Sequence, residues 1–217
     1  MKKTIILSLF ILISSITFAQ KWEPYKVDDS IEVLLPKGLQ KKDTLNRQII
    51  TATTSFGIVM IVINPDDKRT TPDIEKGKHL DRYYSDYIKK VSAAANGTIS
   101  DEKDTLIGQL RVKDFTLALD SGNGKQYRNF RILHENGNTY SFEFLWEDVH
   151  KDYAPAERDK FFSSIKLTGN TGLKTQFTDP SQTTGKAPAG NRSTYIMAGI
   201  LALIVAVLLI IILRRKL

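Results

Sequence analysis

Several features of common enzyme and metal sites are missing from this chain of 217 residues. It contains no cysteine, so it has no disulfide framework and no thiol nucleophile. Its three histidines, His79, His134 and His150, have no His or Cys partner at the spacing of a metal site. Phosphate-binding glycine loops and the Gly-x-Ser-x-Gly motif of hydrolases are also absent. We therefore expect a non-catalytic protein without a cofactor.

The chain also lacks a basic domain, although its formal net charge is +7. Residues 20–168 contain 23 Lys and Arg and 23 Asp and Glu, so this region is neutral. The excess comes from the two ends and from the segment before the C-terminal apolar run. Binding to phosphates requires a basic surface, so we predict no interaction with nucleic acid.

The N-terminus has the pattern of a secretory signal peptide. Lys2 and Lys3 precede an apolar run that ends in Thr17-Phe18-Ala19. Residues 1–19 are predicted to be this signal, with cleavage after Ala19. An uncleaved signal anchor remains an alternative, and it gives the same topology.

The C-terminus has the pattern of a membrane anchor. Nineteen uncharged residues from Tyr195 to Leu213 run into Arg214, Arg215 and Lys216. At about 1.5 Å per residue they form a helix of roughly 28 Å, close to the thickness of a bilayer core. We predict a transmembrane helix at 194–213 and a basic stop-transfer tail at 214–217. The lipid bilayer is thus a predicted partner of the chain.

The two ends together predict a single-pass protein of the plasma (inner) membrane. The domain formed by residues 20–168 is predicted to be periplasmic or extracellular, and the C-terminus cytoplasmic. Residues 169–193 are rich in Gly, Pro, Ser and Thr, so we predict a flexible linker there.

Within the domain, the hydrophobic pattern alternates between strand and helix. Strands are predicted at 31–35, 48–55 and 58–64, and the third is apolar on both faces, as in a covered central strand. A long helix is predicted from Pro72 to Asn96, with Thr70 or Thr71 as its cap. Its apolar stripe includes Tyr84 and Tyr87, whereas Tyr83 is free to meet a partner. A short helix at 155–163 and a strand at 164–167 end the domain.

Four more strands are predicted at 98–103, 109–119, 125–134 and 139–146. A change of alternation near Lys113-Asp114 predicts a bulge. For the hairpin at 135–138 we predict a three-residue loop, because it would pair Phe142 with Ile132 and Phe144 with Phe130.

The order of these segments resembles the PsbP/DcrB-like superfamily. The resemblance rests on residues 31–38 (IEVLLPKG), 127–131 (YRNFR), 138–142 (NTYSF) and 161–166 (FFSSIK), and it extends over most of residues 22–168. It implies an α+β fold: an α/β/α sandwich with a mainly antiparallel central sheet, one long helix and one short helix. It also implies a binding or assembly role, and no catalytic residues.

One polar cluster is a candidate site. Glu147, Asp148, His150 and Asp152 follow the aromatic strand at 139–146. Carboxylates and an imidazole could hold calcium or zinc, or they could serve a hydrolase. The alternative is a solvated loop in which Asp152 caps the next helix.

The leading expectation is a non-catalytic, membrane-anchored binding or assembly module of the cell envelope with a protein partner. The first alternative is a carrier of a small ligand or cation that serves a membrane complex. The second is a hydrolase that uses Glu147, Asp148 and His150. A pocket between helix and sheet would favour a small ligand, and a flat apolar patch would favour a protein partner.

Overall fold

The computed structural model describes residues 20–44, 47–120, 122, 124–169 and 171–178. The predicted signal peptide with Ala19 and the predicted anchor with Arg214, Arg215 and Lys216 lie outside these residues. Neither of the two α-helices in the described part has the length and hydropathy needed to cross a bilayer.

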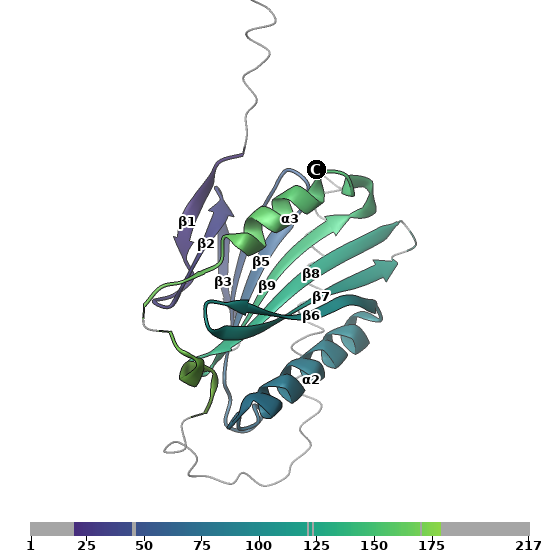
Figure 1. Cartoon of the computed structure of the whole chain (residues 1–217). Coiled ribbons are helices and arrows are strands. Elements are labelled where there is room, and N and C mark those ends of the chain that lie inside the picture. Colours follow the sequence, from purple (N-terminus) through teal and green to yellow (C-terminus); the bar gives the residue numbers. More distant parts are fainter. Residues whose placement is uncertain (1–19, 45–46, 121, 123, 170, 179–217) are drawn as a thin grey trace, which may run out of the picture.

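The described residues form an α+β fold around a seven-stranded antiparallel sheet (Figure 1). Each strand pairs antiparallel with its neighbours, so the expected mainly antiparallel sheet is confirmed. The strands follow the order β3 (Gln40–Thr44), β4 (Arg47–Thr53), β5 (Ile58–Pro65), β9 (Asn138–Glu147), β8 (Lys125–Glu135), β7 (Leu110–Asp120) and β6 (Thr98–Ile107).

Two different layers cover the faces of this sheet. The long helix α2 (Gly77–Ala95) packs on one face (Figure 1). The other face is covered by the short helix α3 (Ala154–Ser163) and by a three-stranded sheet of β1 (Trp22–Lys26), β2 (Ile31–Pro36) and β10 (Lys166–Leu167). A short 3₁₀ turn, η1 (Asp148–His150), connects β9 to α3. The predicted strand at 31–35 therefore belongs to an outer layer.

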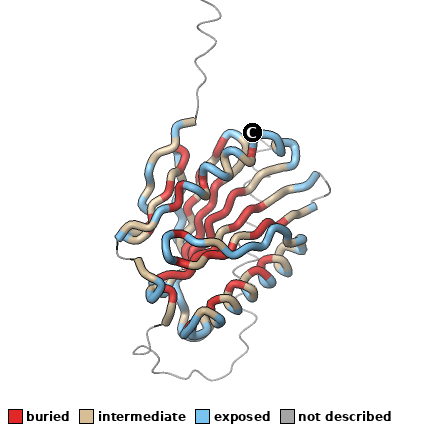
Figure 2. The backbone as a smooth tube through the Cα atoms, viewed as in Figure 1, coloured by how far each residue is buried: buried red, intermediate tan, exposed pale blue. Residues whose placement is uncertain are grey.

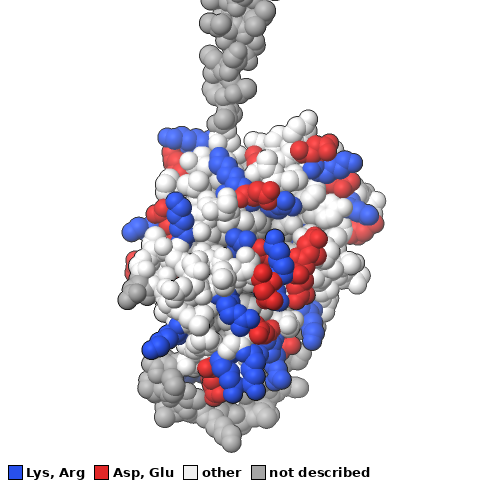
Figure 3. All heavy atoms as spheres, in the orientation of Figure 1, with Lys and Arg blue, Asp and Glu red and all other residues white. Residues whose placement is uncertain are grey.

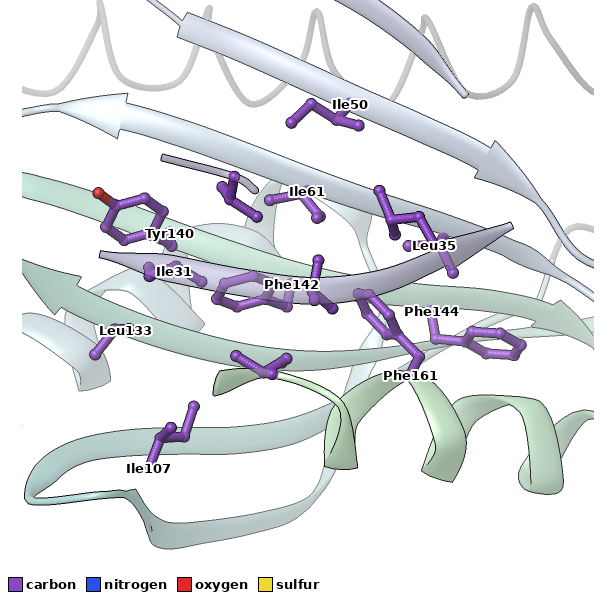
Figure 4. Close-up of a cluster of buried hydrophobic side chains, with 14 of the residues drawn as sticks. Ile31, Leu35, Ile50, Ile61, Ile107, Leu133, Tyr140, Phe142, Phe144 and Phe161 are labelled. Atoms are coloured by element: carbon purple, nitrogen blue, oxygen red, sulfur yellow. The ribbon is translucent and has the colours of Figure 1, made fainter. Parts of the chain in front are cut away.

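The main core lies under α3 and the small sheet. Phe142 and Phe144 of β9 point into it together with Ile61 of β5 and Phe161 of α3 (Figure 4), and all four are fully buried. The strands in the middle of the sheet are buried along most of their length (Figure 2). Strand β5 lies between β4 and β9 with apolar residues buried on both faces, as the sequence predicts.

The helix α2 begins five residues later than predicted. Ile74 is buried before the helix starts, and hydrogen bonds in both directions tie its backbone to Thr178. The predicted cap Thr71 instead accepts a hydrogen bond from the backbone of Asp67. The contact of Ile74 with Thr178, which lies 104 residues later in the chain, thus keeps residues 72–76 out of the helix. The predicted end is correct, because Asn96 has the left-handed conformation of a helix C-cap, with φ 50°.

The predicted three-residue hairpin between β8 and β9 is wrong. The loop is a two-residue turn with positive φ at Asn136 and Gly137, and Phe142 pairs with Arg131. Arg131 is acceptable on the core face because Nε and Nη2 bind Asp114, at 2.7 and 2.8 Å, and Nη1 donates to the Phe162 carbonyl.

The same error applies to Phe144, which pairs with Asn129. The Asn129 side chain bonds Thr116 and the indole of Trp146, each at 2.8 Å. Phe130 lies on the opposite face, towards α2. The prediction failed because it assumed that β8 and β9 each bury only one face.

The predicted bulge at Lys113-Asp114 is also wrong. Strand β7 pairs with β8 without a shift of register, and the irregularity lies in β6, between Ser100 and Lys103. The alternation changes because β7 serves both cores. Val112 packs in the core under α3, whereas Phe115 packs under α2.

Part of the predicted linker packs against the domain. A 3₁₀ turn, η2 (Leu173–Gln176), places Gln176 in a fully buried position. Its carboxamide accepts a hydrogen bond from the Arg111 backbone and donates to the carbonyls of Arg111 and His134. We call residues 172–178 the strap. The structured domain therefore extends to Thr178, and the prediction of a flexible linker from residue 169 is wrong for the strap.

Candidate functional site

A groove of about 1470 Å³ lies beside α2, over the half of the sheet that this helix leaves uncovered. Residues of α2 form one wall, and residues of β3 and β4 form the other. The floor comes from β5, β8 and β9, and the loop 66–72 closes one end. The side chains that line the groove include Asn64, Asp66, Tyr83, Tyr87, Arg128 and Glu143.

A buried ion pair lies in the floor of the groove. Nε and Nη2 of Arg128 both donate to Oε2 of Glu143, and Ser141 donates to Oε1 at 2.8 Å. The Glu143 side chain is 2% exposed, and burial raises the pKa of its carboxyl while Arg128 opposes the rise. The pair gives the floor fixed charges of both signs.

Two tyrosines of α2 bring hydroxyl groups to the floor. Tyr87 interacts with Ser141, and burial raises the pKa of the Tyr87 phenol. The hydroxyl of Tyr83 lies 2.7 Å from Oγ1 of Thr139, and burial raises the pKa of Tyr83 to about 12. Both phenols therefore stay protonated at neutral pH and can donate hydrogen bonds.

A chain of polar groups continues from Tyr83 into the protein. Oγ1 of Thr139 lies 3.2 Å from Nδ1 of His134, and Nε2 of His134 lies 3.7 Å from Oδ2 of Asp66. Burial lowers the pKa of His134 to about 4 and raises the pKa of Asp66 to about 6. His134 is thus neutral at pH 7. When Nε2 of His134 carries the proton, Tyr83 donates to Thr139 and Thr139 donates to Nδ1 of His134. The Nε2 proton then points towards Asp66.

The residue types Thr139, His134 and Asp66 also occur in hydrolase triads, but this arrangement does not present a nucleophile. Thr139 is 1% exposed, and its hydroxyl is already engaged by Tyr83. A catalytic hydroxyl must reach the substrate carbon. The hydrogen bond between Tyr83 and Thr139 therefore links α2 to the sheet, and His134 lies beside Asp66.

The residues of the predicted polar cluster lie elsewhere. Glu147 ends β9, Asp148 begins η1 and Asp152 is exposed in the turn before α3. The His150 ring faces the Phe56 ring, with 5.8 Å between the centroids. None of the four lines the groove, and within the described ranges no group of three or more candidate metal ligands gathers.

The alternative prediction, that Asp152 caps the short helix, is also wrong. The N-cap residue of α3 is Tyr153, which makes no side-chain capping bond in the described part of the chain. The helix start is instead buried through Ala154, and Glu157 accepts two backbone hydrogen bonds from Ser55 and Phe56.

Sequence reasoning missed the floor of the groove. Ser141 and Glu143 alternate with the aromatic residues of β9, a pattern that indicates a solvated face. A usable signal was present in β5, where Met60 and Val62 are as apolar as their neighbours on the other face. They show that this face is covered as well. Only Tyr83 was expected to be available to a partner, and it lines the groove.

Comparison with solved structures shows the fold. The structure of cyanobacterial PsbP (CyanoP) from Synechocystis sp. PCC 6803 is similar with a TM-score of 0.52 and 12% identity, over 70% of this chain and 95% of that chain. LpqN from Mycobacterium tuberculosis, described as involved in cell envelope biogenesis, has a TM-score of 0.40 and 10% identity, over 69% of this chain and 91% of that chain. No protein-family model and no curated protein matches. The similarity to CyanoP supports the PsbP/DcrB-like fold expected from the sequence.

Proposed function

We propose that this chain is a non-catalytic binding module of the cell envelope, anchored in the membrane by its C-terminus, and that the groove beside α2 is its binding site. The groove itself carries this proposal. It combines a concave surface with converging hydroxyl, carboxylate and guanidinium groups, which is the usual composition of a ligand site. A pocket between helix and sheet favours a ligand that enters the domain over a partner that lies on a flat surface.

Three further observations support the proposal. The apolar ends of the sequence have the patterns of an export signal and a membrane anchor. The described domain carries both signs of charge side by side, with Lys and Arg gathered near α2 in this view (Figure 3). The fold occurs in CyanoP.

Site-specific photocrosslinking of the full chain in its native membrane tests the groove. A photoreactive amino acid replaces Asp86 on the α2 wall or Asp43 on the β3 wall. The matched control replaces Asp159, an exposed acid of α3 on the opposite side of the sheet. We expect a mass adduct from the two groove positions and none from Asp159. Equal labelling at all three positions, or none at the groove positions, contradicts the proposal.

A second candidate function is assembly with a protein partner. Val149 is 75% exposed and Tyr153 is 61% exposed, and the Tyr153 ring stacks on Phe56 with 5.1 Å between centroids. Exposed apolar side chains of this kind mark contact surfaces. A photoreactive group at Val149 that captures a protein, while the groove positions capture nothing, would favour this function over ligand binding.

A further inference from the structure

One carboxylate of the groove, Asp66, has no cationic side chain as its partner among the described residues. Asp66 follows β5 and lines the groove with a side chain that is 29% exposed. Its titratable neighbour is His134, with Nε2 at 3.7 Å, and this imidazole is neutral at pH 7. Among the described residues, no lysine or arginine lies within ion-pair distance of this carboxylate, whereas the adjacent Asp67 is paired with Arg69.

The surroundings of Asp66 add acceptors and an aromatic ring. Asn64 pairs with Thr139 across the sheet, and its Oδ1 is buried with no hydrogen-bond partner in the described part of the chain. The Tyr83 ring packs edge-on against His134, with 5.6 Å between the ring centroids. A carboxylate that is 29% exposed, an unpaired carbonyl oxygen and a tyrosine ring together suit a donor that carries positive charge.

We propose that this end of the groove binds an organic cation, a guanidinium or a primary ammonium group, with Asp66 as its counter-ion and Tyr83 beside it. This inference rests on the proposed function of the groove and specifies the ligand class. The same group can come from a small amine or from an arginine or lysine side chain. Inorganic cations fit less well, because one carboxylate and one amide oxygen fall short of the six oxygen ligands of calcium.

Burial of Asp66 agrees with this assignment. Partial removal from water raises the pKa of its carboxyl to about 6. An arriving cation stabilises the charged form. At pH 6 its binding therefore displaces a proton from Asp66, while His134 and Tyr83, the titratable groups that face it, keep their protonation states.

The test uses the full chain in lipid nanodiscs with labelled methionine methyl groups. The sequence has three methionines, and Met60 lies on the groove side of β5, beneath the lining residue Arg128, with Sδ 3.7 Å from Nη2. The probes are butylguanidinium, butylammonium, the uncharged analogue butylurea, and butyrate. We expect the two cations to shift the Met60 signal, and butylurea and butyrate to leave it unchanged.

Two matched variants locate the site. D66N removes the unpaired charge, and D67N removes a carboxylate one residue away that is already paired. We expect D66N to raise the dissociation constant for butylguanidinium at least about tenfold, and D67N to change it less than about twofold. A tripeptide with a central arginine distinguishes the sources, because it binds more tightly than butylguanidinium if a protein side chain is the natural ligand.

Two results would overturn the inference. One is binding of butylguanidinium that D66N does not weaken. The other is a Met60 shift with butylurea or butyrate but with neither cation, which leaves the groove as a binding site and rejects only the ligand class. The photocrosslinking at Asp86 and Asp43 decides the proposed function separately, since it does not depend on the charge of the ligand.

Discussion

The two faces of the central sheet are built from neighbouring residues and differ in composition. On the α3 face, β9 contributes Phe142 and Phe144 to a core that is apolar and fully covered. On the α2 face, the same strand contributes Ser141 and Glu143 to a polar groove. The α3 face therefore buries the larger apolar cluster, and the α2 face has polar groups available to a ligand.

The α2 face is itself divided. Over β7 and β8 the helix packs on an apolar cluster in which Phe115 and Phe130 stack, with 4.3 Å between their ring centroids. Over β9 the floor carries the polar Glu143, beside the apolar Val62 of β5. The helix is thus fixed along one side and forms the wall of a groove along the other. Substitutions in the core under α3 should therefore cost more stability than substitutions in the groove.

The largest effect is expected on the α3 face. Phe142→Ala should lower the free energy of unfolding by about 3 to 5 kcal/mol, because it leaves a cavity in a closed core. Tyr87→Phe on the groove face should cost less than about 1.5 kcal/mol, since it removes only a hydroxyl. Denaturant unfolding measures both. Equal costs would refute the division between the faces.

The buried ion pair should respond next. Arg128→Met leaves Glu143 buried without its cation, and we expect a loss of about 3 kcal/mol of stability. The double variant Arg128→Met with Glu143→Leu should recover most of that loss, because no uncompensated charge remains. If the double variant is as unstable as the single one, the loss does not come from the uncompensated charge of Glu143. The ion pair itself would then stabilise the groove floor.

The neutral His134 should make folding sensitive to acid. Its folded pKa of about 4 lies below the ordinary value of 6.5, so its contribution is complete above pH 6.5 and is lost as the pH falls through 4. The expected loss is on the order of 2 to 3 kcal/mol. Unfolding curves between pH 4 and 7 measure this slope, and His134→Asn should flatten it.

The titration of Asp66 should change the free energy of unfolding with pH in the opposite direction to that of His134. Its folded pKa of about 6 lies above the ordinary value of 3.8, so its contribution is present below pH 3.8 and is lost as the pH rises through 6. Solvent screening reduces this effect, because the Asp66 side chain is 29% exposed. Asp66→Asn should therefore make the slope from His134 steeper. An unchanged slope in Asp66→Asn would contradict the raised pKa of Asp66.

The strap should contribute less to stability than Phe142 or the buried ion pair. Gln176→Ala removes three hydrogen bonds to the backbone of β7 and β8, and we expect a cost of about 2 kcal/mol. Lys174→Ala, at an exposed position of the same turn, is the control. Limited proteolysis should cut the Gln176 variant within residues 172–178 faster than the control. Equal cleavage would show that the strap is held by other contacts.

Local patterns predicted most of the elements. The apolar run at 58–64 identified the central strand, and Asn96-Gly97 identified the end of α2, where a Cβ on Gly97 would come within 2.6 Å of Leu117. The short helix was predicted within one residue of its start. These features depend on residues that are close in the sequence, so propensity and periodicity are enough to find them.

The candidate site could not be predicted in this way. Tyr83 and Thr139 are 56 residues apart, and the Gln176 contacts with Arg111 span 65 residues. The cluster at Glu147, Asp148 and His150 was predicted as a candidate site because its residues are close together in the sequence. Adjacency along a turn does not bring side chains to one point, whereas strand pairing does.

The sequence by itself determined the neutral charge of the domain, both described helices and most of the strands, though not β1 and β3, and the absence of thiol chemistry. It also carries the patterns from which export and anchoring are predicted. Tertiary structure alone decided the register of β8 and β9, the packing of the strap and the gathering of Asn64, Asp66 and Tyr83. The reason is physical. The sequence of a strand shows which residues alternate between its two faces. Which face is buried depends on the helices and strands that cover it, and these come from distant parts of the chain.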